Sequence, residues 1–212
     1  AAVTRALRHA ALLPLLCVLA ACSFIPTISV PQDHYYRLPD PTPPRVYAHP
    51  PLGGALGVAA LRGIGLYQEQ AIAFVDARSP LELHQYNYRF WVEPPTHLVQ
   101  DYLVAYLAKA HAASKVMRLR PGEGAAASIS GDIEHFERVT GNGRDEAVVT
   151  LTLEYGPPDQ FRARRLDKRY SARAPISGRS MEAVAQAFGA ALNQAAGRFL
   201  ADIAALGPAA GH

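Results

Sequence analysis

The residue with the clearest chemical role in this sequence is Cys22, which directly follows two small residues, Ala20 and Ala21. Upstream lie two arginines and an apolar run over residues 10–19. This order of charge, apolar core and small residues is typical of a secretory signal. A cysteine placed immediately after the small pair makes a lipobox, the bacterial motif in which the thiol takes a diacylglycerol and the chain is cut before the cysteine. Residues 1–21 are therefore predicted to be a lipoprotein signal peptide.

This segment has two other interpretations. A transmembrane anchor needs about 20 apolar residues, and the run here is about half as long. An ordinary signal peptide remains an alternative. Ser23 follows the cysteine at the position where aspartate usually retains lipoproteins in the inner membrane, so serine favours export to the outer membrane. Two or three acyl chains would anchor the protein stably, since a single chain is only marginal.

The charge balance limits the kinds of partner, and the cysteine content limits the disulfides that the mature chain can form. The formal net charge is +3, but without Arg5 and Arg8 the mature chain has 19 basic residues against 18 acidic ones. This near-neutral balance predicts no nucleic-acid partner. Cys17 would leave with the signal and Cys22 would carry lipid, so the mature domain is expected to fold without a disulfide.

Most of the remaining sequence is predicted to form short strands. Apolar and polar residues alternate over 147–155, which predicts an antiparallel strand with one buried face. Asn142 and Gly143 suit the positive φ of a tight turn before that strand. Residues 71–75 and 81–90 predict a hairpin. Further strands are predicted at residues 35–38, 56–61, 128–139 and 161–173.

Two segments have helical periodicity. The first follows Pro94 and runs to about Ala112, with an apolar stripe made of Leu98, Val99, Tyr102, Leu103, Tyr106, Leu107 and Ala110. The second has Ser180 as its N-cap and is stopped by Gly207 and Pro208. Its apolar face comprises Met181, Val184, Phe188, Leu192, Ala195, Phe199 and Ile203.

These elements predict an α+β fold, an antiparallel-rich mixed β-sheet with two long α-helices packed on one face. Residues 22–54 would hold the lipidated cysteine, the first strand and a proline-rich tether or loop. Residues 55–206 would supply the remainder of a single α+β domain, which includes the strand at 35–38. Residues 207–212 would form a tail.

No set of side chains in the sequence predicts a reaction centre. Glu182 stands where a nucleophile elbow built on Ser180 would need glycine, so Ser180 is interpreted as a helix cap. The histidines are scattered and no two lie four residues apart on a helix, which disfavours a zinc site. We therefore expect no enzymatic activity, no cofactor and no metal.

A basic run lies along the last predicted strand. Its charges fall on both alternations, so neither face of that strand can be fully buried. It could be a charged edge strand that resists aggregation, or a docking surface for an acidic partner or for anionic lipid headgroups. The run comprises Arg162, Arg164, Arg165, Lys168, Arg169 and Arg173.

Aromatic residues gather where the strand at 81–90 meets the first helix. Such clusters usually belong to the core, and the alternative is a shallow apolar groove for a partner helix or an acyl chain. The residues of this junction are Tyr88, Trp91, Tyr102 and Tyr106.

Several of these motifs occur together in one known family. They are the lipobox ending at Cys22, Tyr35-Tyr36-Arg37-Leu38, Tyr88-Arg89-Phe90-Trp91-Val92-Glu93-Pro94, Gly131-Asp132-Ile133-Glu134 with Phe136-Glu137, and Phe188 with Leu192 in an alanine-rich closing helix. In these motifs the sequence resembles the ABC-type transport auxiliary lipoproteins, the family of the paraquat-inducible protein C component. The likeness covers nearly all of the mature chain.

The resemblance implies a non-enzymatic part of a lipid-trafficking system. Its partners would be a mammalian-cell-entry-type periplasmic lipid-binding protein and an ABC permease with its ATPase. The lipoprotein would be anchored at the periplasmic face of the outer membrane and help to move phospholipid or another hydrophobic compound across the periplasm. Homo-oligomer formation is compatible with the sequence. Only Cys22 is carried over from the family, as the lipidation site.

An alternative from a different class is a periplasmic lipoprotein enzyme such as a hydrolase, which the lack of a coherent nucleophile-and-base set disfavours. The second alternative is a binding module. Lipoprotein binding modules that regulate a peptidoglycan synthase also combine a lipobox, a proline-rich tether and a small α+β domain. Identification of the binding partner would separate the two functions.

Overall fold

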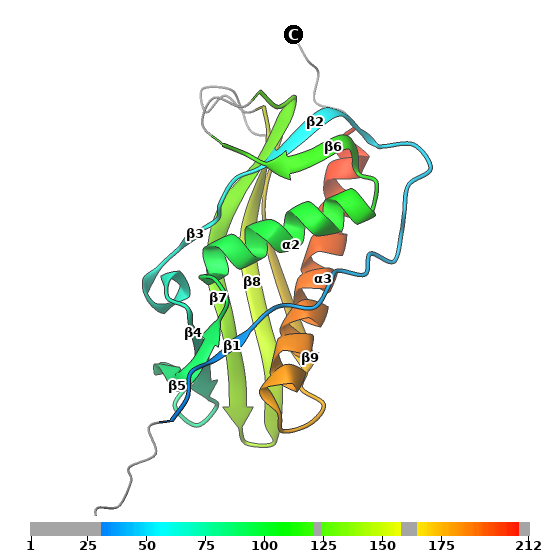
Figure 1. The fold of residues 1–212 in the computed structure, drawn as a ribbon. Helices are drawn as coiled ribbons and strands as arrows, with labels where there is room; N and C mark the ends of the chain where they lie inside the picture. The colour runs from blue at the N-terminus through cyan, green and yellow to red at the C-terminus, as the bar shows by residue number, and fades with distance from the viewer. Residues whose placement is uncertain (1–30, 121–123, 158–164, 208–212) are drawn as a thin grey trace, which may run out of the picture. The chain divides into compact units, whose positions relative to one another are not determined.

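The computed structural model describes residues 31–120, 124–157 and 165–207. By its internal contacts the chain divides into Ala1–Gln32 and Asp33–His212, and the second unit contains all the elements below (Figure 1). In chain order these elements are β1 His34–Tyr36, β2 Leu52–Val58, β3 Arg62–Gly63, the 3-10 helix η2 Gly65–Gln68, β4 Ala71–Asp76, β5 Leu83–Trp91, α2 Pro95–Lys109, β6 Ala113–Arg118, β7 Ala127–Gly141, β8 Arg144–Gly156, β9 Leu166–Pro175 and α3 Met181–Leu206.

The described strands form one nine-stranded sheet in which β7 has the most neighbours. β7 pairs in parallel with β2, β3 and β4 and antiparallel with β8, which is in turn antiparallel to β9. β4 and β5 are antiparallel, whereas β1 joins β5 and β6 joins β2 in parallel. The sheet is therefore mixed, with five parallel and three antiparallel pairs. The prediction of an antiparallel-rich sheet is wrong, because it counted the hairpins and not the long-range pairings of β7.

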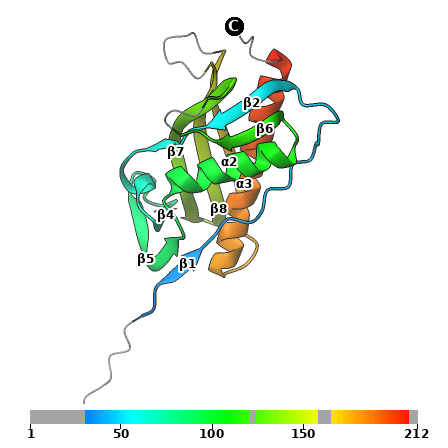
Figure 2. The ribbon, with the colours of Figure 1, turned by 45° about the horizontal axis from the view of Figure 1, so that its top comes forward.

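The core lies between the sheet and the helices. α3 packs along β8 and β9, and α2 contacts β6 and α3 (Figures 1 and 2). The Tyr102 hydroxyl donates a 2.9 Å hydrogen bond to the Gly189 carbonyl and so joins the two helices. Trp91, Phe136 and Phe188 are fully buried and their rings contact one another. That both helices cover one face of the sheet stays a prediction.

Local sequence signals produced the expected caps and turns. The Ser180 hydroxyl accepts a hydrogen bond from the Ala183 amide, as expected of an N-cap. Asn142 and Gly143 form the β7–β8 turn with φ of 53° and 73°, the positive values that such two-residue hairpins require. These features confirm the predicted helix start and the predicted turn.

Three boundaries differ from the prediction. α2 ends at Lys109 rather than near Ala112, because His111 adopts a left-handed φ of 55° that breaks the helical path. The chain then enters β6, a strand that was not predicted. The strand predicted at 56–61 begins and ends earlier, since β2 spans Leu52–Val58, and the short strand β3 begins only at Arg62.

β8 is buried on both faces rather than on one. Its core-facing residues are buried as predicted, but Val148, Thr150 and Glu154 on the opposite face are also less than 9% exposed. That face has its own hydrogen bonds, in which Ser130 donates to Glu154 and the Thr150 and Ser171 hydroxyls pair.

Candidate functional site

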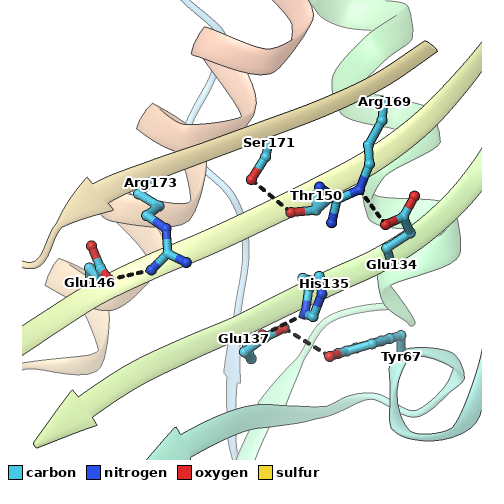
Figure 3. Close-up of polar contacts among 9 residues, drawn as sticks. All are labelled: Tyr67, Glu134, His135, Glu137, Glu146, Thr150, Arg169, Ser171 and Arg173. Carbon is cyan, nitrogen blue, oxygen red and sulfur yellow. Dashed lines mark hydrogen bonds and ion pairs between the residues drawn. The ribbon is translucent and has the colours of Figure 1, made fainter. Parts of the chain in front are cut away.

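The candidate site lies on the face of β7, β8 and β9 opposite α3, and a β-bulge in β7 creates it. The register of β7 against β8 shifts between Ile133 and His135. Ile133 and Phe136 are both buried although they are three residues apart, a spacing that would place them on opposite faces of a regular strand. The extra residue allows Glu134 and His135 to join Glu137 on the outer face (Figure 3).

Glu137 is the most buried carboxylate of this face, at 5% exposure, and both of its oxygens have partners. The Tyr67 hydroxyl donates to Oε2 at 2.8 Å, and His135 Nδ1 lies 2.9 Å from Oε1 (Figure 3). Burial first, and the adjacent carboxylate second, raise the pKa of Tyr67, so its hydroxyl stays a donor. A carboxylate accepts hydrogen bonds, so the second contact is a hydrogen bond in the tautomer that carries the proton on Nδ1.

Two arginines of β9 are oriented by carboxylates of the neighbouring strands. Arg169 Nε donates to Glu134 Oε2 at 2.6 Å, and Arg173 Nη1 donates to Glu146 Oε1 at 2.6 Å (Figure 3). The Thr152 hydroxyl donates to the other Glu134 oxygen at 2.5 Å. This hydrogen bond first, and the arginine second, lower the pKa of Glu134, which therefore stays ionised.

A cleft of about 320 Å³ lies beside these ion pairs, and its polar lining includes His135, Thr150 and Ser171. Thr150 and Ser171 are cross-strand partners, their hydroxyl oxygens are 2.9 Å apart, and His135 is opposite Thr150. The charged residues that line the cleft are Glu137, Arg144, Arg169 and Arg173, and its apolar residues are Val75, Ala77, Pro80, Val139 and Val148. The cleft thus combines hydrogen-bond donors with an apolar wall, an arrangement typical of ligand sites.

The described residues of the predicted basic run lie in two environments, the cleft and the contact with α3. Arg169 and Arg173 line the cleft. Lys168 pairs with Asp202 of α3 at 2.7 Å, and Arg165 donates to the Leu206 and Gly207 carbonyls at the end of that helix. Arg162 and Arg164 lie outside the described residues. β9 pairs only with β8 among the strands described, and Arg198 of α3 donates to the Ser171 carbonyl on this edge strand.

The residues of the aromatic junction also lie in two environments, the protein interior and its surface. Trp91, Tyr102 and Tyr106 are buried, at 5% exposure or less. Tyr88 is 42% exposed and has a left-handed φ of 59° within β5. Such a conformation costs a non-glycine residue roughly 1–2 kcal/mol. The structure therefore brings three of these residues into the interior and leaves Tyr88 at the surface.

Cys22 and Ser23 lie outside the described residues, and lipidation and sorting at these positions stay predictions. In the part of the chain that the structure describes, no helix has both the length and the apolarity needed to cross a membrane.

Sequence reasoning did not identify Tyr67, His135, Glu137, Thr150 or Ser171 as site residues. One signal in the sequence could have indicated the bulge. In Gly-Asp-Ile-Glu-His-Phe-Glu, residues 131–137, two apolar residues are three apart within a predicted strand. In a regular strand, residues three apart point to opposite faces, so both could not be buried in one core. One extra residue in the strand, a β-bulge, explains the spacing.

The second unit combines an α+β fold with a small ligand-sized cleft that is flanked by paired charged side chains. The chain belongs to the family of ABC-type transport auxiliary lipoprotein components, whose model matches residues 36–199. This confirms the resemblance inferred from the sequence motifs. It also identifies the protein as an auxiliary component of ABC-type transport.

Solved structures share the fold at low sequence identity. The crystal structure of protein XCC0632 from Xanthomonas campestris, of the DUF330 family, is 21% identical with a TM-score of 0.66, over 81% of this chain and 95% of that one. The crystal structure of an uncharacterised protein is 12% identical with a TM-score of 0.58, over 83% of this chain and 99% of that one. At these identities the likeness shows the fold alone. No curated protein matches the chain in sequence.

Proposed function

We propose that this protein is a lipid-anchored, non-enzymatic component of an ABC-type transporter that moves phospholipid or another hydrophobic compound across the periplasm. The observation that carries the proposal is the family match over residues 36–199, because this family supplies auxiliary lipoproteins to ABC-type transport. The partners would be a mammalian-cell-entry-type periplasmic lipid-binding protein with its permease and ATPase.

The anchor would be a diacylglycerol on Cys22, inserted into the periplasmic face of the outer membrane. Lipidation is supported by the lipobox, and the outer-membrane location by Ser23 at the sorting position. Acyl chains contribute about 0.8 kcal/mol for each buried CH₂ group, so two or three chains hold a domain at the membrane firmly. The residues between Cys22 and β1 would give the domain reach into the periplasm. The predicted proline-rich loop after β1 is not part of that tether, because Thr42 is hydrogen-bonded to Asn193 of α3 and Lys109 of α2 donates to Asp40 and Pro41.

The geometry of the cleft supports recognition rather than turnover. Glu134 and Glu146 each accept a hydrogen bond from an arginine, and both oxygens of Glu137 have partners. Paired charges of this kind fix side-chain positions and match a surface to a partner. The role that we assign to the domain is therefore binding and docking.

Replacement of Cys22 tests the anchor directly. Cys22→Ala, expressed behind an ordinary cleavable secretion signal, is expected to move the protein from the membrane pellet to the soluble periplasmic fraction. Immunoblotting of fractionated cells measures the change. Retention in the membrane after signal cleavage would contradict lipid anchoring.

Ser23→Asp is the matched control, because it preserves the lipid and changes only the sorting residue. The variant is expected to stay in the membrane pellet but to shift to the inner-membrane band of a density gradient. An unchanged position would contradict the assignment to the outer membrane.

A further inference from the structure

We propose that the cleft on β7, β8 and β9 binds the phosphate group of an anionic amphiphile. The apolar part of that molecule would contact Val75, Val139 and Val148, which line the same cleft. The inference rests on the proposed function and deepens it, because it assigns a chemical class to the compound that the domain meets.

The hydrogen-bond donors of the cleft lie around one pair of hydroxyl groups on the sheet. Arg169 and Arg173 are each two residues from Ser171 along β9, or about 7 Å at strand spacing. They therefore flank the hydroxyl pair of Thr150 and Ser171, whose oxygens are 2.9 Å apart (Figure 3). A single phosphate group above these hydroxyls could accept hydrogen bonds from both sides.

Each arginine is oriented and keeps donors for a ligand. A guanidinium has five N–H donors in a rigid fork. The ion pair of Arg169 uses Nε, and that of Arg173 uses Nη1. The carboxylates behind them therefore fix the two forks and leave terminal N–H groups available, and such forks match phosphate oxygens in geometry as well as in charge.

Three arginines and one carboxylate line the cleft, and two of the arginines are ion-paired with Glu134 and Glu146 beside it. The arginines are Arg144, Arg169 and Arg173, and the carboxylate is that of Glu137. The Tyr67 hydroxyl donates to Glu137 and His135 Nδ1 lies 2.9 Å from it, so both oxygens of this carboxylate already have partners. Arg144 makes no ion pair with any residue that the structure describes. Arg144 is therefore the cation that an entering anion would neutralise, while Arg169 and Arg173 would contribute hydrogen-bond donors.

The remaining wall is apolar and adjoins the donors. Glu137 is opposite Val148 in the β7–β8 register, and Val75 is opposite Val139 between β4 and β7. At about 320 Å³ the cleft lies at the low end of ligand-site volumes. It therefore suits a phosphate headgroup with its adjoining apolar atoms rather than a whole two-chain lipid.

Calorimetric titration of the purified full-length lipoprotein in non-ionic detergent tests the proposal. The probes are inorganic phosphate, glycerol phosphate and dihexanoyl phosphatidylglycerol below its micelle concentration. We expect the short-chain lipid to bind more tightly than either phosphate without a chain. Equal affinity for inorganic phosphate and the lipid would overturn the amphiphile assignment in favour of a free-phosphate site.

The variant Arg169→Gln with Arg173→Gln is expected to weaken lipid binding about tenfold or more, as the loss of charged hydrogen bonds predicts. The matched control is Arg37→Gln with Lys115→Gln, which removes the same charge from exposed positions outside the cleft and should leave affinity unchanged. Ser171→Ala preserves both arginine ion pairs, so a loss of affinity in this variant cannot come from a lost ion pair. Equal effects of the cleft variant and the charge control, or no binding by the wild type, would overturn the proposal.

Failure of this inference is distinguishable from failure of the proposed function. If the wild type binds no lipid but still co-purifies with the transporter components, only the headgroup site is wrong. If it binds the lipid but recovers no transporter component, the proposed function is contradicted and the site remains.

Discussion

Trp91→Ala is expected to lower the free energy of unfolding by about 3–5 kcal/mol, the range for a fully buried large aromatic residue. Trp91 has no exposed surface, and its ring centroid lies 5.7 Å from that of Phe136 and 5.1 Å from that of Phe188. These contacts join β5, β7 and α3, so the truncation leaves a cavity where three elements meet. Urea unfolding followed by far-ultraviolet circular dichroism measures the change.

Trp91→Phe is the matched control for this prediction. The indole N–H is buried and has no hydrogen-bond partner among the described residues, so phenylalanine preserves an aromatic ring and removes an unsatisfied donor. We expect a cost of about 1 kcal/mol or less. Wild-type stability of Trp91→Ala would contradict the core position and favour the interpretation of this junction as a solvent-lined groove.

Gly131→Ala is expected to destabilise the protein by roughly 3 kcal/mol. A Cβ atom at Gly131 would lie 2.1 Å from the carbonyl oxygen of Thr152 and 3.1 Å from the Leu153 Cα. Because both atoms belong to the backbone of β8, the clash can be relieved only by separating the two strands. For a domain of this size the melting temperature should fall by about 6–12 °C, which differential scanning calorimetry measures.

Gly124→Ala controls for the general effect of replacing glycine, since a Cβ at that position meets no atom within 4 Å. Its stability should stay within about 0.5 kcal/mol of wild type. Equal melting temperatures for the Gly131 and Gly124 variants would contradict the close approach of β7 and β8. The same contact lies two residues before the bulge, so its loss should also disturb the cleft.

Features specified within a few residues could be predicted from the sequence. The length of α3 follows from an apolar face that repeats over the whole segment between Ser180 and Gly207. The β7–β8 hairpin follows from Asn142 and Gly143, because few other residue pairs accept two consecutive positive φ values. In each case the residues that decide the structure are close together in the chain.

The parallel pairings could not be predicted in this way. β2, β3 and β4 meet β7 across long separations in sequence, and nothing in their local patterns specifies the partner. β6 was missed for a related reason. Its residues 113–118 include exposed polar side chains and no clean alternation, and its position depends on pairing with β2.

The cleft illustrates the same limit. Arg169 and Arg173 were identified as part of a basic run, but the sequence alone did not show that Glu134 and Glu146 would orient them. Tyr67 is distant from Glu137 in the chain and joins it only because η2 and β7 come together in the fold. The sequence therefore predicted functional side chains that lie together in one segment. It did not predict the partners that other segments bring to them.

Co-purification from native envelopes tests the central claim most directly. The lipid-anchored protein would be crosslinked in cells, isolated through a C-terminal tag and analysed by mass spectrometry for its partners. The proposed function predicts recovery of a mammalian-cell-entry-type protein together with an ABC permease and its ATPase. Recovery of peptidoglycan synthases without any transporter component would contradict it and favour the synthase-regulator alternative.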